Sequence, residues 1–288
     1  MRLSHLLEES TDRIAGAADS DSARLDAELL VAAAIAKPRS FLYAFSETEV
    51  EGAPLHTARD AVARRVTGHP VAYILGEKEF WGLTLSVDER VLIPRPETEL
   101  LVELALALPL VSDAVVADVG TGSGAIALAL ASEKPWFFVA ADYSMSALTL
   151  AAENRARYAD SVPPFGGAGS AAVLLRADWL SAFADNSFDL VLSNPPYIDG
   201  DDAHLQRGDV RFEPRTALVS DEQGLRDIRR ISEQAWRCLK PGGHLLLEHG
   251  YQQGEAVAEL LLRCGYREVI CHWDLAGLPR VSSAVVGK

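Results

Sequence analysis

From residue 113 to the end of the chain, short apolar runs typical of buried strands alternate with longer segments typical of helices. The strand-like runs are residues 115–119, 137–141, 173–175, 188–192, 244–248, 269–271 and 283–286, and the helical segments are 125–131, 145–158, 224–239 and 253–263. This alternation predicts a doubly wound, mostly parallel, Rossmann-like α/β sheet. The connection between the last two runs is too short for a parallel crossover, so one of them should run antiparallel.

The chain before this region has a different pattern. Apolar side chains fall at helical spacing from residue 1 to about 76, which predicts an N-terminal helical bundle. Residues 79–87 and 90–93 alternate in a strand-like way and predict a linking β-hairpin. A helix should begin near Pro96, a residue type favoured in the first helical turn. We therefore expect a helical domain at 1–76, a linker with the hairpin and this helix at 77–112, and an α/β domain at 113–288.

A glycine-rich stretch closes the first strand of the α/β domain and opens the next helix. Gly120, Gly122 and Gly124 permit a tight turn and let a ligand approach the backbone, and Thr121 and Ser123 lie between them. The N-terminus of the following helix offers free N–H groups to an anion. The stretch satisfies the dinucleotide fingerprint of nicotinamide enzymes as well as the glycine loop of methyltransferases, so both enzyme classes stay open. A structural turn that binds no ligand is the third alternative.

Two further positions suit a nucleoside. Asp142 ends the second strand, where a carboxylate can accept both hydroxyls of a ribose or can cap the following helix. Asp178 and Trp179 come just after the third strand. Asp178 can accept an adenine amino group and Trp179 can cover the base, although a tryptophan in the core is an equal alternative.

The most specific stretch is Ser193-Asn194-Pro195-Pro196-Tyr197, directly after the fourth strand. Ligands of such sheets bind outside the carboxyl ends of the strands. The two prolines make a rigid, extended arm. This arm presents the side-chain oxygen of Asn194 and the carbonyl of Pro195, with Tyr197 beyond them. Two adjacent acceptors and an aromatic face suit a planar NH2 group, which donates two hydrogen bonds.

Asn-Pro-Pro-Tyr at this position resembles the catalytic motif of methyltransferases that use S-adenosylmethionine (SAM) and act on planar amino or amide nitrogens. Several other stretches resemble the PrmC/HemK family of release factor glutamine N5-methyltransferases, and the likeness covers nearly the whole chain. They are residues 93–99 (IPRPETE), 120–127 (GTGSGAIA), 193–198 (SNPPYI), 212–218 (FEPRTAL) and 246–250 (LLEHG).

This resemblance implies a specific function. Members of the family methylate the glutamine of the Gly-Gly-Gln motif in class I peptide chain release factors. The positions then imply that SAM, which leaves as S-adenosylhomocysteine, contacts the glycine loop at 120–124 together with Asp142, Asp178, Trp179 and Asn194. The substrate glutamine would contact Asn194, Pro195, Pro196 and Tyr197, of which Asn194, Pro195 and Tyr197 are the catalytic candidates. The helical domain would help to hold the release factor.

The net charge helps to distinguish a release factor methyltransferase from other methyltransferases that share the motif. An adenine-N6 DNA methyltransferase shares Asn-Pro-Pro-Tyr, but it needs a basic cleft, whereas this chain has a formal net charge of −14. We therefore expect no stable binding to nucleic acid. A ribosomal-protein glutamine methyltransferase is a closer alternative. A SAM-binding module with little turnover, or a nicotinamide dehydrogenase, would leave the Asn-Pro-Pro-Tyr stretch unexplained.

Other classes find little support in the sequence. No metal site is expected, because His244 and His249 lie at either end of one strand without a cluster of acidic or cysteine partners. The chain start has no apolar signal core, and no run approaches the ~18 uncharged apolar residues of a membrane span. We therefore expect a cytoplasmic protein that binds no membrane, and we expect it to be a monomer.

A local run of arginines has two interpretations, either a solvated, ion-paired helix face or a contact with the partner protein. The run contains Arg207, Arg211, Arg215, Arg226, Arg229 and Arg230.

Overall fold

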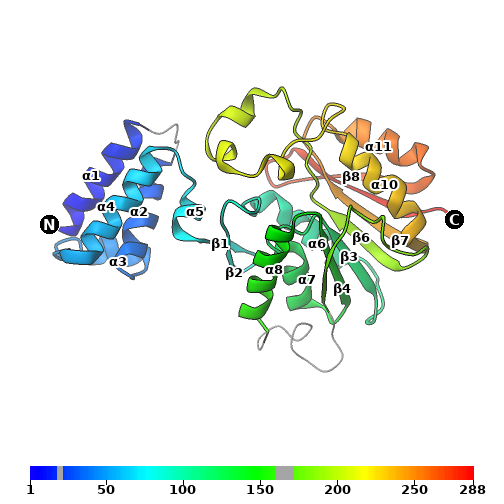
Figure 1. The fold of residues 1–288 in the computed structure, drawn as a ribbon, viewed down its shortest axis with the longest axis horizontal. Helices are drawn as coiled ribbons and strands as arrows, with labels where there is room; N and C mark the ends of the chain where they lie inside the picture. The colour runs from blue at the N-terminus through cyan, green and yellow to red at the C-terminus, as the bar shows by residue number, and fades with distance from the viewer. Residues whose placement is uncertain (18–21, 160–171) are drawn as a thin grey trace. The chain divides into compact units, whose positions relative to one another are not determined.

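The computed structural model describes residues 1–17, 22–159 and 172–288 and divides them into two compact units (Figure 1). Unit 1 contains Met1–Glu77 and Ala203–Glu213, and unit 2 contains Lys78–Asp202 and Pro214–Lys288. The loop predicted at residues 163–169 lies outside the described residues. Among the described residues, no helix is long and apolar enough to cross a membrane.

Unit 1 is built mainly of helices, as its apolar spacing predicts. The helices are α1 (Leu3–Ala15), α2 (Ala23–Ala34), α3 (Arg39–Ala44), α4 (Gly52–Val66) and α5 (Val71–Leu75). Their apolar faces enclose one core, in which Leu3, Leu6 and Leu30 are almost fully buried. The segment Ala203–Glu213, with the short 3-10 helices η2 (Ala203–Gln206) and η3 (Asp209–Phe212), belongs to this unit although it follows the Asn-Pro-Pro-Tyr stretch in sequence.

A buried arginine connects this segment to the helices. Arg65 of α4 donates from Nε to Asp26 Oδ2 (2.7 Å) and from Nη1 to Asp209 Oδ1 (2.9 Å). The side chains of Arg65 and Asp26 are only 7% and 8% exposed. Arg211 also donates to the carbonyl of Thr67. The basic run predicted from sequence is therefore divided, since its first two arginines belong to unit 1 and the others to unit 2.

Replacing Arg65 with methionine should destabilise unit 1 by about 3–5 kcal/mol, because it leaves the Asp26 carboxylate buried without its cation. Urea unfolding followed by helical circular dichroism measures the loss. Arg2→Met is the matched control, since Arg2 pairs with Glu47 through side chains that are 57% and 72% exposed. That pair should contribute less than about 1 kcal/mol. Equal losses of unfolding free energy in the two variants would contradict a stabilising role of the buried Arg65–Asp26 pair.

Unit 2 contains the predicted seven-stranded sheet, in the order β5-β4-β3-β6-β7-β9-β8. Its strands are β3 (Val115–Val119), β4 (Phe137–Asp142), β5 (Val173–Arg176), β6 (Phe188–Ser193), β7 (Leu239–Glu248), β8 (Tyr266–Trp273) and β9 (Pro279–Val286). The first five pair in parallel, whereas β9 runs antiparallel to both β7 and β8. The mostly parallel fold and the single antiparallel strand are confirmed.

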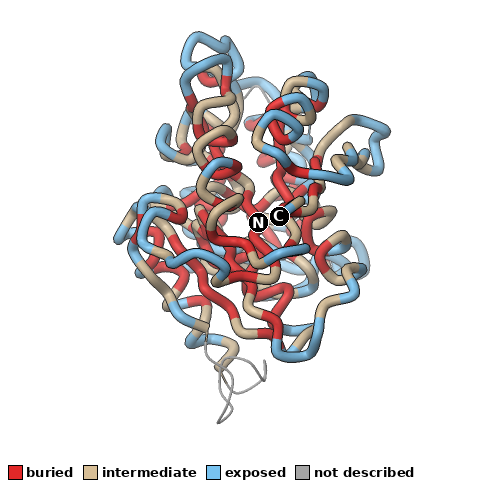
Figure 2. The backbone as a smooth tube through the Cα atoms, turned by 90° about the vertical axis from the view of Figure 1, so that its right-hand side faces the viewer, coloured by how far each residue is buried: buried red, intermediate tan, exposed pale blue. Residues whose placement is uncertain are grey.

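Helices cover both faces of this sheet (Figure 1). The helices of unit 2 are α6 (Glu99–Ala107), α7 (Ala125–Glu133), α8 (Met145–Arg157), α10 (Arg226–Cys238) and α11 (Gly254–Arg263). Alternate residues of β3 face opposite cores, because Val116 packs with α6 and α7 whereas Ala117 packs with α10 and α11. The buried residues accordingly follow the strands through the middle of the domain (Figure 2).

The linking hairpin is present, but its turn was predicted in the wrong place. Its strands are β1 (Glu77–Phe80) and β2 (Leu83–Ser86), so the turn at Trp81-Gly82 divides the segment 79–87 that was predicted as one strand. The predicted strand at 90–93 is wrong. The cause is Asp88, which turns the chain by accepting the Arg90 backbone N–H at 3.0 Å and by binding the Arg90 guanidinium. The fully buried Asn154 of α8 holds β2 in place, since its side chain bonds both backbone groups of Ser86 and the carbonyl of Ser123.

Candidate active site

A cavity of about 880 Å³ lies within unit 2 beyond the carboxyl ends of β3, β4 and β6. Its volume is within the range of pockets that hold small molecules and cofactors. The residues lining it include most of the candidates named from sequence: Gly120, Thr121, Gly122, Ser123, Asp142, Asp178, Trp179, Asn194 and Pro196. Chain topology thus brings together four sequence stretches at one edge of the sheet.

The glycine loop has the conformation that its composition requires. Gly120, Gly122 and Gly124 have φ of 77°, 56° and 83°, values that other residues rarely adopt. Gly120 also lies against the indole of Trp179, where an added Cβ would come within 3.0 Å of Cζ3. Gly124 is the N-cap residue of α7 and does not line the cavity. The loop therefore exposes backbone beside the Trp179 ring.

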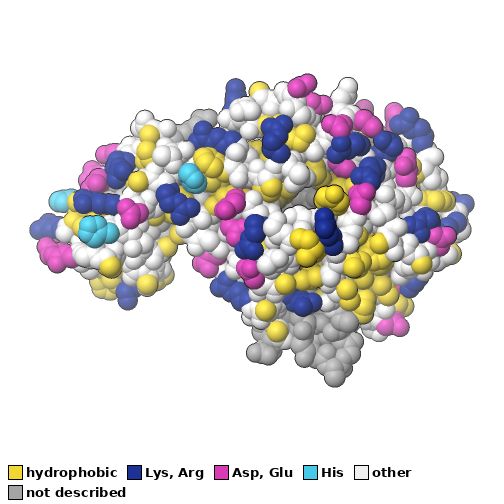
Figure 3. All heavy atoms as spheres, in the orientation of Figure 1, with side chains coloured by type: hydrophobic (Ala, Val, Ile, Leu, Met, Phe, Trp, Pro, Cys, Tyr) yellow, Lys and Arg dark blue, Asp and Glu magenta, His cyan; other side chains and the backbone are white. Residues whose placement is uncertain are grey.

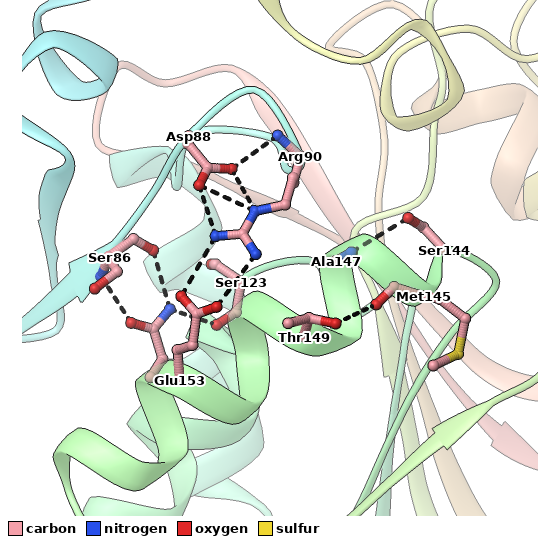
Figure 4. Close-up of polar contacts among 10 residues, drawn as sticks. Ser86, Asp88, Arg90, Ser123, Ser144, Met145, Ala147, Thr149 and Glu153 are labelled. Atoms are coloured by element: carbon pink, nitrogen blue, oxygen red, sulfur yellow. Dashed lines mark hydrogen bonds and ion pairs between the residues drawn. The ribbon is translucent and has the colours of Figure 1, made fainter.

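Asp142 connects the glycine loop to the N-cap residue of α8 through its two carboxylate oxygens. Oδ2 accepts the Gly122 N–H at 2.9 Å, and Oδ1 accepts the Ser144 N–H at 2.8 Å. Ser144, and not Asp142, is the N-cap residue of α8, because its hydroxyl accepts the Ala147 N–H (Figure 4). Burial raises the Asp142 pKa. Each carboxylate oxygen has a second lone pair, so Asp142 keeps acceptor capacity toward the cavity.

Asp118 is a buried carboxylate that the sequence argument did not single out. It accepts the Thr121 hydroxyl at 2.6 Å and the Ala127 N–H at 3.2 Å, so it connects the glycine loop to the first turn of α7. Its other oxygen has no hydrogen-bond partner in the described part of the chain. Burial raises the Asp118 pKa to about 7. An acidic residue two positions before the first glycine of the loop is the signal that could have identified it.

The Asp178 carboxylate is already engaged by a cation. It accepts a hydrogen bond of 2.7 Å from Arg230 of α10. The helix also carries Arg226, paired with Asp221 and Asp227, and Arg229, paired with Glu222 and Glu233. Between residues 226 and 230 the basic run is therefore an ion-paired helix face.

The Asn-Pro-Pro-Tyr stretch follows β6 directly. Asn194 donates from Nδ2 to the Thr98 hydroxyl at 3.1 Å, and Asn194 and Pro196 both line the large cavity. Pro195 is buried and is not among the residues that line it. The preceding residue, Ser193, donates to the Val119 carbonyl, which joins the start of the stretch to β3.

Tyr197 lines a second, smaller pocket of about 200 Å³ instead of the large cavity. It shares this pocket with Arg95, Glu97, Glu248 and Arg280, and Arg95 also lines the large cavity. The Tyr197 hydroxyl donates to Glu248 Oε1 at 3.3 Å. Burial and the nearby Glu248 carboxylate raise the Tyr197 pKa far above its usual range, so the phenol stays protonated and remains a donor.

Arg90 is a further residue of the cavity wall that sequence reasoning placed in a strand. Its guanidinium binds Asp88 on its own segment and Glu153 on α8 (Figure 4). These carboxylates raise the Arg90 pKa, so the side chain stays cationic. Its position depends on the turn at Asp88, which neither strand alternation nor motif spacing reveals.

Among the residues that the structure describes, no group of three or more His, Cys, Asp or Glu side chains is placed to hold a metal ion. His249, one of the two histidines weighed from sequence, is fully buried. Its Nδ1 lies 3.0 Å from the Gly250 carbonyl and its Nε2 3.0 Å from the Ser282 hydroxyl.

Comparison with known proteins covers both units. A family model described as PrmC N-terminal domain matches residues 5–76, and one described as methyltransferase small domain matches residues 96–210. A release factor glutamine methyltransferase of Pseudomonas aeruginosa is 50% identical over 266 residues, which are 92% of this chain and 93% of that protein. One of Salmonella typhimurium is 44% identical over 283 residues, which are 98% of each chain. A methyltransferase from Pyrococcus furiosus shares the fold, with a TM-score of 0.54 and 17% identity over 80% of this chain and 99% of its own.

Proposed function

The chain belongs to the release factor glutamine methyltransferase family, and on that premise we propose that it methylates the side-chain amide nitrogen (N5) of a release factor glutamine. The methyl donor is S-adenosyl-L-methionine, and the target is the glutamine of the Gly-Gly-Gln motif in class I peptide chain release factors. One observation of the structure supports this most directly. Asn194 lines a cofactor-sized cavity that also contains the glycine loop and Asp142.

The residues of the cavity suit SAM. The left-handed glycine loop leaves backbone open to a ligand, Asp142 offers acceptors for ribose hydroxyls, and the Trp179 ring offers a face for adenine. Asp178 keeps lone pairs for an adenine amino group beside its bond to Arg230. When bound, SAM supplies an electrophilic methyl group on a sulfonium.

The chain's own residues then act on the amide. An amide nitrogen is a poor nucleophile because its lone pair is delocalised into the carbonyl. Asn194 Oδ1 accepts one of its N–H bonds and favours lone-pair character on nitrogen. The Pro195 carbonyl, the second acceptor predicted from sequence, belongs to a buried residue that does not line the cavity in this structure. Most of the rate gain comes from holding the nitrogen in place, which can contribute about 7–11 kcal/mol in well-oriented reactions. The helical unit 1 contributes to holding the release factor.

Asp142→Ala should raise the dissociation constant for SAM by about 30-fold, the loss expected for one hydrogen bond to a charged group. Calorimetric titration of the variant with SAM measures this change. Asp142 does not contact the transferred groups in this scheme, so kcat at saturating SAM should stay within about threefold of the unsubstituted protein. Unchanged SAM affinity would remove Asp142 from the cofactor site.

A labelling experiment tests the function as a whole. The protein is supplied with methyl-labelled SAM and one of four acceptors: a release factor, the same factor with its Gly-Gly-Gln glutamine changed to alanine, a ribosomal protein fraction, or duplex DNA. Label is expected on the first acceptor only. Equal label on the alanine variant would refute the assigned glutamine, and label on ribosomal protein would favour that alternative substrate.

Label on DNA would instead favour an adenine methyltransferase. The distribution of charged side chains on the surface makes that outcome unexpected. On the face drawn in Figure 3, lysine and arginine side chains are interspersed with aspartate and glutamate, whereas a protein that holds a phosphate backbone usually presents a basic face. The net charge of −14 has the same implication.

A further inference from the structure

The smaller pocket, which Tyr197 of the Asn-Pro-Pro-Tyr arm lines, has no role in the mechanism above. Its volume is about 200 Å³, and the residues that line it are four charged ones and this tyrosine: Arg95, Glu97, Tyr197, Glu248 and Arg280. Pockets that hold a whole small molecule usually measure about 300–1,000 Å³. A pocket of this size therefore suits one part of a larger ligand.

One side of this pocket presents a carboxylate oxygen that lacks a donor. Glu248 ends β7 and is only 1% exposed, and its Oε1 accepts the Tyr197 hydroxyl at 3.3 Å. Its Oε2 has no hydrogen-bond partner among the described residues. Leaving a buried charged atom without a partner is unfavourable. The pocket therefore suits a ligand that brings an N–H to this oxygen.

A hydrogen-bond donor lines the same pocket. Arg280 of β9 binds Asp274 through Nε and Nη2, each at 3.2 Å, and its side chain is 13% exposed. Its Nη1 makes no hydrogen bond to the part of the chain that the structure describes. Because a guanidinium carries five N–H donors, Arg280 keeps donors for a carbonyl oxygen of the ligand.

The charges of the pocket favour a neutral ligand. Two arginines and two glutamates line it, so their formal charges cancel when both carboxylates are ionised. A free anion would meet the glutamates, a free cation would meet the arginines, and like charges repel. A peptide main chain is neutral and alternates N–H donors with C=O acceptors. It is therefore the class of ligand that matches Glu248 Oε2 and Arg280 Nη1 together.

The pocket is within reach of a polypeptide bound at the large cavity. Tyr197 follows Asn194 by three residues on the same arm, so their Cα atoms are at most about 11 Å apart. Arg95 lines both the large cavity and the smaller pocket. A protein that places a glutamine side chain against Asn194 therefore brings its neighbouring main chain within reach of the smaller pocket.

We propose that the smaller pocket is a substrate subsite that binds the main chain next to the target glutamine. A main-chain N–H donates to Glu248 Oε2, and a main-chain carbonyl accepts from Arg280 Nη1. The inference rests on the proposed function, in which two glycines precede the glutamine of the release factor. Glycine suits a subsite of this size, because it has no side chain that the pocket must accommodate.

Arg280→Met should raise the Michaelis constant for the release factor by about 30-fold, the loss expected for one hydrogen bond to a charged group. Steady-state kinetics at saturating SAM measures this change. Both kcat and the SAM dissociation constant should stay within about threefold of the unsubstituted values, because Arg280 is not among the residues that line the large cavity. An unchanged Michaelis constant would overturn the subsite.

Arg263→Met is the matched control. Arg263 is an exposed arginine of the same unit and lines neither pocket. Its Michaelis constant for the release factor should stay within about twofold of the unsubstituted value, as for other surface substitutions. An equal rise in Arg263→Met and Arg280→Met would mean that the release factor responds to the net charge of the unit, and it would overturn the subsite.

Glu248→Leu removes the acceptor and keeps a side chain of similar size. It should also raise the Michaelis constant for the release factor by about 30-fold. The kinetics are measured at about pH 8.5, because burial raises the Glu248 pKa to about 7 and the ionised carboxylate is the acceptor. A lower kcat with an unchanged Michaelis constant would instead indicate that Glu248 only positions Tyr197, and it would overturn the subsite.

The unsubstituted protein separates this inference from the proposed function in the same assay. If the unsubstituted protein methylates no release factor, the proposed function fails. If it methylates the release factor and both Arg280→Met and Glu248→Leu keep its Michaelis constant, the subsite alone fails.

A binding measurement needs no turnover and does not depend on the stability of a variant. N-methylacetamide contains one peptide group, and N,N-dimethylacetamide has the same carbonyl but no N–H. In nuclear magnetic resonance, the Arg280 Nε–H signal is identified as the one missing from Arg280→Met. N-methylacetamide should shift this signal saturably, with a dissociation constant about tenfold lower than that of N,N-dimethylacetamide. Equal shifts by the two amides, or no shift by either, would overturn the subsite whatever the protein methylates.

Discussion

Asn194→Ala should lower kcat for release factor methylation by about 1,000-fold while SAM still binds, because the substitution removes an acceptor at the reacting nitrogen. Asn194 follows β6 directly, and its Nδ2 is engaged by Thr98, so Oδ1 is the atom left for the substrate. Single-turnover labelling at saturating SAM and release factor measures the chemical step without product release.

The binding measurements make this result specific. In the proposed function SAM contacts Gly120, Gly122 and Asp142, which line the cavity, so calorimetry should give a SAM dissociation constant within about threefold of the unsubstituted value. Loss of SAM binding together with activity would place Asn194 in the cofactor site alone. A near-normal kcat would show that the amide is activated elsewhere, and the scheme would be wrong.

The part of the site that could be predicted from sequence is the part that lies on contiguous motifs. Two apolar runs mark the strands: the glycine loop follows residues 115–119, and the Asn-Pro-Pro-Tyr stretch comes after residues 188–192. The strand ends and the residues after them could therefore be identified from sequence. The parallel register of β3 with β6 then brings Asp118 opposite Leu192, two residues before Asn194. Topology alone therefore places the two motifs side by side.

The parts that could not be predicted depend on contacts between distant residues. Thr98 and Asn194 are 96 positions apart, and Tyr197 and Glu248 are 51 apart, so no local spacing signals either hydrogen bond. Asp209 lies 144 positions from Arg65, and their ion pair joins the segment after the Asn-Pro-Pro-Tyr stretch to the helices of unit 1. Helical periodicity reports which face is buried, but it does not report which distant polar group that face meets.

Gly224 is another residue that only the structure reveals as important to the site. It has a φ of 82°, and an added Cβ would lie 2.0 Å from the Tyr197 carbonyl oxygen and 2.6 Å from Gln253 Nε2. The same Gln253 amide donates to the Tyr197 carbonyl at 3.0 Å. A methyl group at position 224 therefore cannot be accommodated unless the backbone of the Asn-Pro-Pro-Tyr arm moves.

Gly224→Ala should accordingly lower kcat by about 100-fold, since a displacement of about 1 Å at a catalytic group costs that much. The Michaelis constant for SAM should change far less, because Gly224 is not among the residues that line the cavity with the glycine loop and Asp142. Steady-state kinetics with SAM and release factor varied in turn separates the two effects. A crystal structure of the variant should show the Tyr197 carbonyl displaced.

Gly242→Ala separates the clash from the cost of backbone conformation. Gly242 has a φ of 74°, but nothing lies within 4 Å of an added Cβ there. Both alanine variants should lose about 1–2 kcal/mol of stability from the left-handed conformation. Only Gly224→Ala should lose turnover, because only its methyl group meets the Tyr197 carbonyl of the Asn-Pro-Pro-Tyr arm. Equal kcat values in the two variants would mean that the Asn-Pro-Pro-Tyr arm tolerates the displacement. The rigid position that the two prolines give to Asn194 would then not be needed for the observed rate.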